Sequence, residues 1–556
     1  MRIPKLFLPL LLGATIPALF LATSIHGGTF SANFNDGLIP AGTLVFGGGD
    51  NPAYLPVVEA PGGVGDTACL KLTKNANGQW GSFIIEDLDS GAAVYGVRAT
   101  FMARVGGGTS VPADGWSFCV SPDLPNATWG ETGAGSGLRV CFDTYDNTDG
   151  DPFNGTGEAP QIRLVIGGQT VATTPLLPLS DLINNAFVPV EIKLNADGSF
   201  DLTYNGKVHF SKVFFPGYQP LYYPRLGFGA RTGGLNANHW IDDLNIETYT
   251  TPKPGIAQNP QSQTVVVGAS ATFSVTVNNG DAATIEWLRN GTVIPGEVGT
   301  TYTLTGAALT DSGAKFSARA TLGGTTVTSA EATLTVVAID LPATPILSYN
   351  FNDGLVPSEA VVYGDGLAAD GWTPWSPYVA LFGGVGDSGV LELTEAANGQ
   401  KGAFIIADQH AGAPVYGVAA RFDVRIGGGS AVPADGMSFN FAADLPDSAN
   451  AGDVEEGVGS GLRVCFDIYD NADGNPHNAT GEAPAITLKW GPTVVGEVKT
   501  ALNDLVTGDA FADVIVRLTP DGLLDVAWNG KVLLYRAPVP GFGSIASGRF
   551  GFFART

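Results

Sequence analysis

One acidic loop carries the residues of this sequence that are best suited to chemistry. It reads FDTYDNTDGDP, from Phe142 to Pro152, and offers side-chain or carbonyl oxygens at alternating positions before an acid and a proline. Oxygen ligands in this pattern suit a hard cation such as Ca²⁺, whose charge two carboxylates would balance. The same composition is also typical of a polar turn formed by Asp and Asn side chains, so both interpretations stand at this point.

The loop occurs a second time in the chain. FDIYDNADGNP, from Phe466 to Pro476, repeats the polar positions as Asp467, Tyr469 and Asn471, with Asn475 in place of the closing acid. The recurrence favours a binding site over a simple turn, although shared ancestry alone could preserve it.

Catalytic motifs are missing from the sequence. It contains no E-x-D-x-x-E run, which could place two carboxylates about 5 Å apart as a retaining glycosidase requires. It also lacks G-x-S-x-G, H-E-x-x-H and Walker sequences, and its five histidines show no metal-binding spacing. We therefore expect no enzyme and no catalytic residues, with a glycoside hydrolase as the remaining enzymatic alternative.

Long stretches of the sequence are repeated, which indicates a duplicated domain. GGVGDTACLKLTKNANGQWGSFII from Gly62 returns as GGVGDSGVLELTEAANGQKGAFII from Gly383. The copies are predicted over 28–250 and 345–556. Each has roughly 220 residues, which is too long for the unit of a solenoid.

Each copy is expected to be antiparallel all-β. Short β-branched and aromatic runs alternate with Gly, Asp-Gly and Asn-Gly turns, and VEIKLNADGSFDLTYNGKVHF from Val190 predicts a meander of strands. Helical periodicity is nearly absent; only SDLINNAF from Ser180 and its partner LNDLVTGDAF could form a helical turn. At this length a two-sheet jelly roll is the natural solution.

The segment 251–340 between the copies has a different pattern. A proline-rich start leads into seven short strand-like runs with one tryptophan, Trp287, expected in the core. This segment resembles the immunoglobulin-like fold, although Phe316 replaces the corner tyrosine and paired cysteines are absent. We expect a third β-sandwich that acts as a spacer.

The second copy lacks a segment that closes the first. The first copy continues after RLGFGART into GGLNANHWIDDLNIET, an alternating strand that ends near Thr248, whereas the second stops at Thr556. Terminal strands of a jelly roll are commonly neighbours, so the second copy is expected to have an unpaired edge. Either the sequence is a fragment or another segment fills the gap.

Composition and charge exclude several classes of function. The 556 residues include 28 Lys+Arg and 53 Asp+Glu, a net charge of −25, which disfavours nucleic acid and anionic membranes as partners. Residues 1–24 have a positive start and an apolar run broken by prolines, which is typical of a secretory signal peptide rather than an anchor. We expect a secreted or cell-surface protein with no membrane span after signal removal.

The cysteines are few: Cys69, Cys119, Cys141 and Cys465. Cys119 and Cys141 lie on strands expected to pair. Successive side chains of a strand point to opposite faces of the sheet. Asp114 is therefore expected on the face opposite to that of Cys119, and Asp143 on the same face as Cys141. If both aspartates serve one site, the two sulfurs point to opposite sides of the sheet, and buried free thiols are expected instead of a disulfide.

Taken in order, these motifs resemble the L-type (legume-like) lectins. An early F-N-F-like strand, A-D-G before an apolar strand, a Gly-rich loop, FDTYDN and G-F-G-A-R-T-G-G follow one another through the first copy, and most recur in the second. The resemblance implies a concanavalin A-like jelly roll that binds carbohydrate with the help of calcium.

The resemblance also implies which residues hold the calcium. The ligands would be three side chains and the Tyr145 carbonyl in the first copy, with four counterparts in the second: Asp143, Tyr145, Asn147 and Asp151, then Asp467, Tyr469, Asn471 and Asn475. Asn475 carries no charge, so weaker calcium binding is expected in the second copy. Cys141 and Gln161 stand where the family has a glutamate and a histidine of a second metal site. That transition-metal site is expected to be lost, a zinc-binding thiolate being the remaining option.

A sugar site beside the calcium follows from the same resemblance. Asp114, after a cis Ala113–Asp114 bond, would accept hydrogen bonds from two sugar hydroxyls, and the Tyr145 ring would lie beneath the sugar. The other members would be Gly135, Gly137, Asn147, Gly233 and Gly234 in the first copy, and Asp435, Tyr469 and Asn471 in the second. Residues 233–239, ending at His239, would form a variable wall that the second copy lacks.

Two functions therefore follow from the sequence. The first is an exported, calcium-dependent, lectin-like protein for surface adhesion or glycan capture, with glycans or cell-surface polysaccharide as its partners. The alternative is a structural or adhesive extracellular protein whose jelly rolls no longer bind sugar.

Overall fold

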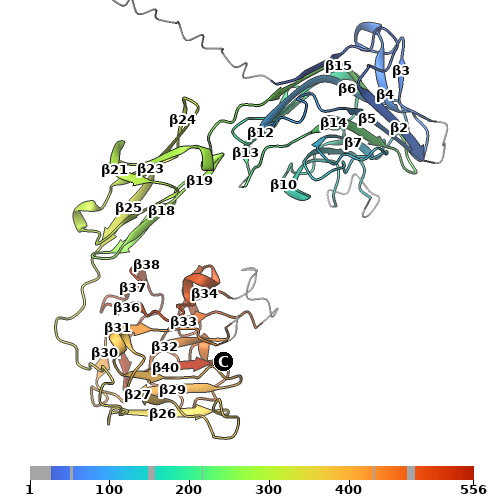
Figure 1. Ribbon diagram of the computed structural model, residues 1–556. Helices are drawn as coiled ribbons and strands as arrows, with labels where there is room; N and C mark the ends of the chain where they lie inside the picture. Colours follow the sequence, from blue (N-terminus) through green and yellow to red (C-terminus); the bar gives the residue numbers. More distant parts are fainter. Residues whose placement is uncertain (1–26, 50–53, 148–156, 216, 430–432, 472–482) are drawn as a thin grey trace, which may run out of the picture.

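The computed structural model describes residues 27–49, 54–147, 157–215, 217–429, 433–471 and 483–556 (Figure 1). Nearly all of its regular structure is β-strand in several sandwich sheets, so the predicted all-β fold class is confirmed. Two single helical turns, α1 (Leu179–Leu182) and α2 (Leu502–Leu505), lie where the sequence predicted them. No helix of the described residues is long and apolar enough to cross a membrane. The predicted signal peptide lies outside the described residues.

Two sheets form the first repeat. One consists, in spatial order, of β13 (Lys207–Phe214), β12 (Ser199–Tyr204), β11 (Asn184–Leu194), β6 (Gly96–Gly106), β15 (Asn238–Tyr249), β4 (Cys69–Thr73) and β3 (Val57–Glu59), with β1 (Thr29–Ala32) also paired to β15. The other consists of β10 (Gln169–Thr173), β9 (Gln161–Ile166), β8 (Leu138–Asp143), β7 (Gly115–Ser121), β14 (Arg225–Arg231), β5 (Gln79–Ile85) and β2 (Thr43–Gly49).

Successive side chains of a strand point to opposite faces of its sheet, so every second residue of these strands faces the core. Trp116 of β7 and Phe142 of β8 point inward and stack with their ring centroids 4.0 Å apart. The predicted meander is present as β11, β12 and β13. Its second turn has positive φ at both Asn205 (51°) and Gly206 (73°), the combination that a tight Asn-Gly hairpin turn requires.

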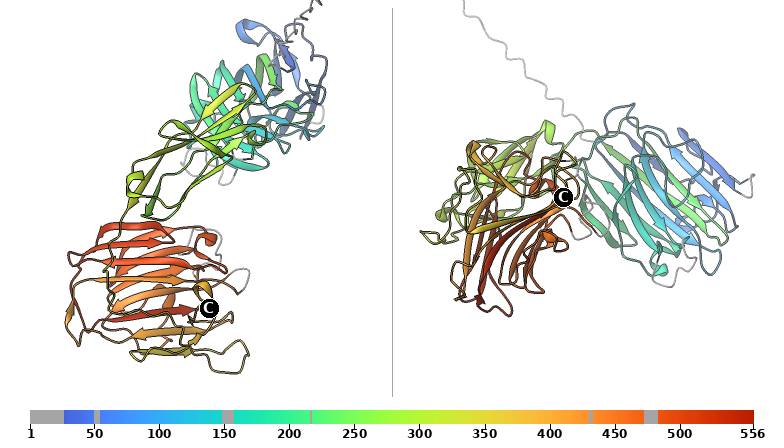
Figure 2. Two further views of the ribbon diagram at one scale, coloured as in Figure 1. Left: turned by 60° about the vertical axis from the view of Figure 1, so that its left-hand side comes forward. Right: turned by 90° about the horizontal axis from the view of Figure 1, so that it is seen from below.

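The second repeat reproduces most of this arrangement. One sheet has the order β26 (Ala360–Asp365), β29 (Lys401–Ile406), β40 (Arg549–Arg555), β32 (Gly436–Ala442), β33 (Leu462–Asp467), β34 (Ala485–Trp490) and β35 (Thr493–Lys499). Opposite it lie β31 (Val418–Val424), β36 (Ala512–Leu518), β37 (Leu523–Trp528) and β38 (Lys531–Pro538). The strands β27 (Tyr378–Ala380) and β28 (Val390–Glu392) form a separate pair. Figure 2 shows the strands of this repeat from two further sides.

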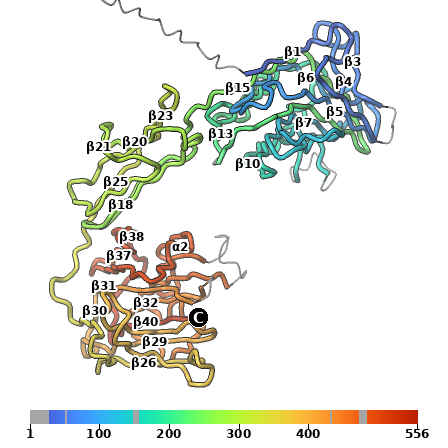
Figure 3. The backbone as a smooth tube through the Cα atoms, in the orientation of Figure 1, coloured from blue at the N-terminus to red at the C-terminus, as the bar shows by residue number. Residues whose placement is uncertain are grey.

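The middle segment is a smaller β-structure. Its largest sheet contains β21 (Thr292–Val298), β20 (Thr284–Arg289), β23 (Lys315–Leu322), β25 (Ala332–Val337) and β17 (Gln263–Val266), with β24 (Thr325–Thr328) beside β23. The pairs β18 (Ala271–Ser274) with β22 (Thr301–Leu304) and β16 (Gly255–Gln258) with β19 (Thr276–Asn278) complete it. Trp287 and Phe316 are fully buried in its core, as predicted for Trp287. The backbone tube in Figure 3 follows the chain through this segment into the second repeat.

The cysteines are free and buried, as predicted, but the argument from alternation was wrong. The register pairs Ser117 with Cys141 and Cys119 with Arg139, so Cys119 and Cys141 lie on the same face of the sheet. Counting every second residue from Asp114 to Cys119 fails because β7 begins only at Gly115, so Asp114 is not part of the strand. Burial raises the pKa of Cys119 to about 11, so the thiol stays protonated at neutral pH.

His239 of β15 makes the stability of the first repeat depend on pH. It is buried with Nδ1 2.7 Å from Thr73 Oγ1, and burial lowers the pKa of His239 to about 3. The unfolded chain takes up this proton more readily, so the stability from neutral His239 is complete above about pH 6.5 and is lost as the pH falls toward 3. We predict a loss of about 2–3 kcal/mol from this residue between pH 7 and pH 4.5. Denaturant titrations of wild type and His239→Asn at both pH values measure it, and a difference that does not change with pH would contradict it.

Candidate functional site

Asp114 lies at the point where β7 meets its two neighbours. Its backbone N–H donates to the Arg231 carbonyl of β14 (2.9 Å), and its carbonyl accepts from the Thr144 N–H after β8 (2.9 Å). The Ala113–Asp114 bond is cis, as the resemblance implied, and the equivalent Ala434–Asp435 bond is cis too. The backbone on both sides of Asp114 is therefore held by the sheet.

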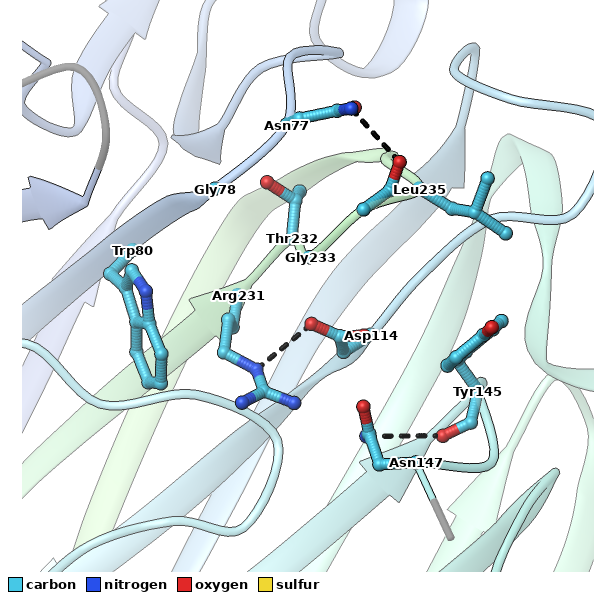
Figure 4. Close-up of a pocket in the computed structure, with 11 residues that line it drawn as sticks. Asn77, Gly78, Trp80, Asp114, Tyr145, Asn147, Arg231, Thr232, Gly233 and Leu235 are labelled. Carbon is cyan, nitrogen blue, oxygen red and sulfur yellow. Dashed lines mark hydrogen bonds and ion pairs between the residues drawn. The ribbon is translucent and has the colours of Figure 1, made fainter. Parts of the chain in front are cut away.

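A cavity of about 460 Å³ opens in front of Asp114 (Figure 4). Its walls come from four separate segments: Asn77, Gly78, Trp80, Asp114, Tyr145, Asn147, Arg231, Thr232, Gly233, Gly234 and Leu235. The Trp80 and Tyr145 rings lie at opposite ends, with Asp114 and Arg231 between them. The cavity thus combines aromatic surface, a carboxylate and amide groups, and its volume suits a small ligand.

Arg231 joins two buried carboxylates at the back of this cavity. Its Nε lies 2.9 Å from Asp114 Oδ2 and its Nη2 lies 2.8 Å from Glu131 Oε1, both carboxylate side chains being only 4% exposed. The guanidinium carbon also lies 4.9 Å from the centroid of the Trp80 ring. Burial raises the pKa of Asp114 to about 6, with Arg231 opposing that rise and Glu131 adding to it.

The second repeat contains the same trio of charged residues. Arg555 places Nε 2.6 Å from Asp435 Oδ2 and Nη2 3.0 Å from Glu455 Oε1. Burial raises the pKa of Glu455 to about 7. Because the trio occurs in both repeats at equivalent strand ends, it is part of the architecture of this site.

The wall of the cavity explains why a glycine stands at position 233. A β-carbon there would lie 2.9 Å from Asp114 Oδ2, so any larger residue would collide with the carboxylate. Gly234 is held in place by Asn77, whose Nδ2 donates to the Gly234 carbonyl (2.9 Å). Of the four predicted glycines, Gly233 and Gly234 therefore line the cavity.

Three other predicted members do not line this cavity. Gly137 donates its N–H to Ser121 Oγ (2.8 Å), and Gly135 also lies against Ser121, which ends β7. Asp114 precedes the other end of that strand, so neither glycine can offer an N–H there. His239 is buried in β15, which limits the wall to residues before it.

The predicted calcium ligands are only partly described. Asp143 Oδ2 accepts a hydrogen bond from Arg163 Nη2 (3.1 Å), while Asp143 Oδ1 is buried without a hydrogen-bond partner among the described residues. Burial and the charge of Glu131 raise the pKa of Asp143 to about 8. Asn147 lies close by, with Nδ2 3.4 Å from the Tyr145 carbonyl. Asp151 lies outside the described residues.

This donor set is suited to calcium, although it is incomplete within the described residues. They contain no cluster of three His, Cys, Asp or Glu side chains able to hold a metal. Yet burying a carboxylate oxygen without a hydrogen-bond partner costs free energy unless the oxygen binds a cation or a proton. Gln161, which the resemblance placed at a second metal site, lies opposite Asp143 in the register. The side chain that contacts Asp143 is that of Arg163.

The second loop differs in its surroundings. Asp467 Oδ2 is buried without a hydrogen-bond partner among the described residues, and burial together with Glu456 raises the pKa of Asp467. Glu456 is ion-paired to Lys489, and Asn471 Nδ2 lies 3.4 Å from Glu455 Oε1. Tyr469 donates its N–H to Asp467 Oδ1 (3.2 Å). Asn475 lies outside the described residues.

Sequence reasoning missed Arg231, Glu131 and Trp80. Recurrence in the two repeats could have revealed the first two, because Arg555 stands at the position of Arg231 and Glu455 at the position of Glu131. Trp80 gave no such signal, because the second repeat has a lysine there.

Several solved protein structures are similar to parts of this chain. No family model and no curated protein sequence matches it. The carbohydrate recognition domain of Emp47p is 16% identical over 41% of this chain and 97% of its own, with a TM-score of 0.29. The exoplasmic/lumenal domain of VIP36 in its Ca²⁺/Man3GlcNAc-bound form is 15% identical over 37% of this chain and 86% of its own (TM-score 0.27). A chimeric titin Z1Z2 is 28% identical over 16% of this chain and 98% of its own (TM-score 0.15).

Proposed function

We propose that the first repeat is a calcium-dependent carbohydrate-binding module of an exported, lectin-like protein. The observation that supports this most is the cavity in which Asp114 lies between Trp80 and Tyr145. A carboxylate accepts hydrogen bonds from two hydroxyl groups, and aromatic faces cover the C–H surface of a sugar ring. Glycans or cell-surface polysaccharide are the partners that this chemistry suits.

Calcium would be held by Asp143, Asn147, Asp151 and the Tyr145 carbonyl. When bound, it supplies a fixed positive charge beside the cavity. Asp143 has a buried oxygen available for it, and Asn147 and Tyr145 contribute to both the loop and the cavity wall. The side chains of this loop would therefore orient the sugar, while the Asp114 carboxylate would accept hydrogen bonds from its hydroxyl groups.

The second repeat is proposed to be the weaker binder. Lys401 replaces Trp80, and Asn475 replaces the closing acid of the loop. Compared with the first repeat, the second therefore lacks one aromatic ring beside the carboxylate and one negative charge in the loop.

The test is a glycan array probed with the full chain, with calcium and then with EDTA. We predict binding that EDTA removes and added calcium restores, because chelation takes away the ion that orders the loop. Calorimetry should detect calcium binding at or below millimolar concentration, and Asp143→Asn should weaken it about tenfold or more by removing one charged ligand. Glycan binding that is unchanged in EDTA would contradict the calcium requirement.

A structural or adhesive role without sugar binding is the second candidate. It is favoured by the ion pair between Arg231 and Asp114, which already engages one carboxylate oxygen at the back of the cavity. Absence of any glycan binding by a folded, calcium-loaded chain would support this candidate over the first.

A further inference from the structure

The middle segment and the second repeat share one continuous β-sheet. β17 of the middle segment pairs with β38, so the order β25, β17, β38, β37, β36 runs through both. Figure 1 shows β36 to β38 on the side of the second repeat next to the middle segment. Val265 stands opposite Lys531, and the Val266 N–H donates to the Gly530 carbonyl (2.8 Å). Edge strands otherwise expose unpaired backbone groups, so each domain covers part of the edge of the other.

An apolar cluster continues this contact. Ile339, just after β25, is buried together with Ile515 of β36 and Ala527 of β37. All three are 8% exposed or less, and Leu341 packs against them, whereas Asp340 is exposed. The chain that joins the two domains therefore lies on the sheet of the second repeat.

The two repeats differ at the covered positions, although their hairpins align without a gap. In the first repeat Glu191 stands opposite Thr203, and the Glu191 side chain is 43% exposed. The same positions of the second repeat are Ile515 and Ala527. Polar side chains thus occupy the face that is open in the first repeat, and apolar ones occupy it where the middle segment covers the second.

The residues around the apolar pair are charged. On the same face of the second repeat, ion pairs join Arg421 to Asp513 (2.7 Å) and Arg517 to Asp525 (3.4 Å). The apolar pair thus interrupts a charged face at the point where the joining chain lies.

A glycine at the tip of each hairpin gives the same contrast. A β-carbon at Gly530 would lie 2.6 Å from the β-carbon of Ala269 in the middle segment, whereas one at Gly206 would meet no described atom within 4 Å. φ is positive at both glycines, 79° and 73°, so an alanine would cause similar backbone strain at either. Of the two tips, that of the second hairpin is the one in contact with the middle segment.

We propose that the middle segment and the second repeat form one unit that unfolds as a whole, separately from the first repeat. The junction with the first repeat is held by polar contacts, such as those of Asn279 Nδ2 with the carbonyls of Ala196 (3.0 Å) and Lys253 (2.7 Å). In the described part of the chain, no cluster of buried apolar side chains spans that junction. The middle segment is then part of the folded unit of the second repeat and not a free spacer, and this inference does not depend on sugar or calcium.

Hydrogen exchange of the full chain at increasing urea concentrations tests this, with EDTA present and no glycan. Mass spectrometry follows 315–322 of the middle segment, 512–518 of the second repeat and 188–194 of the first. The first two should lose protection at the same urea concentration. Phe273→Leu weakens the buried core of the middle segment and should lower both of these midpoints equally, with no change in 188–194.

A second variant removes the contact itself. Ile515→Glu with Ala527→Thr gives the second repeat the residues that the first carries at these positions, so the hairpin itself should fold. The midpoints of 315–322 and 512–518 should then separate, and the Val266 N–H should exchange about tenfold or more faster. Midpoints that still coincide in this double variant would contradict the proposal.

Gly530→Ala and Gly206→Ala form a matched pair, of which only the first should speed exchange at Val266. This pair gives the answer where the double variant does not fold, because it leaves every other side chain in place. Equal effects of the two would overturn the proposal. So would separate midpoints in the wild type, or a shift confined to 315–322 in Phe273→Leu.

Discussion

Asp114→Asn is expected to weaken glycan binding by the full chain about 100-fold or more. The carboxylate would accept two hydrogen bonds from sugar hydroxyls, and hydrogen bonds to a charged group are each worth about 1.5–3 kcal/mol. The amide has nearly the same shape, and Arg231 keeps Glu131 as an ion-pair partner 2.8 Å away. Folding should therefore survive the change. Binding isotherms with the strongest array ligand in calcium measure the effect.

The second repeat offers the matched control for this experiment. Asp435 also follows a cis bond and contacts an arginine, but its repeat has Lys401 where the first repeat has Trp80. Asp435→Asn should change glycan affinity less than about twofold if the first repeat carries the binding, since a twofold change is below 0.5 kcal/mol. An equal loss from both variants would place binding in both repeats. No loss from Asp114→Asn would remove that carboxylate from the site.

Arg231→Met is expected to have the largest effect on the stability of the first repeat. It leaves Asp114 and Glu131, both buried, without the cation that joins them. Breaking a buried ion pair costs about 3–5 kcal/mol, and we expect about 2–3 kcal/mol because the Arg231 side chain is 23% exposed. Denaturant titration followed by a probe in the first repeat measures the change.

A surface ion pair of the same repeat provides the comparison. Arg98 lies 2.7 Å from Glu191, and both side chains are substantially exposed. Arg98→Met should therefore cost less than about 1 kcal/mol. Adding Glu131→Gln to Arg231→Met should restore part of the lost stability, because one unpaired carboxylate is removed. Equal costs for Arg98→Met and Arg231→Met would show that burial of the trio contributes nothing.

Local patterns in the sequence were enough for the fold class. Asn-Gly and Asp-Gly turns and short β-branched runs specify hairpins through residues that are neighbours in the chain, as at Asn205 and Gly206. Self-comparison revealed the repeats, and the resemblance to the L-type lectins implied the cis bond at Asp114. Both follow from the order of residues along the chain, so they can be recognised without knowing which strands pair.

The site required the pairing of distant strands. Arg231 is more than one hundred residues from Asp114 along the chain and meets it only because β14 lies beside β7, with Arg231 opposite Gly115. The resemblance placed Gly135 and Gly137 at the sugar, whereas the register of β7 and β8 puts them at the other end of the strand. The sequence by itself therefore determined an all-β chain with an acidic loop in each repeat. Only the tertiary structure decided which charges share one cavity, because strand order and register set distances between residues far apart in the chain.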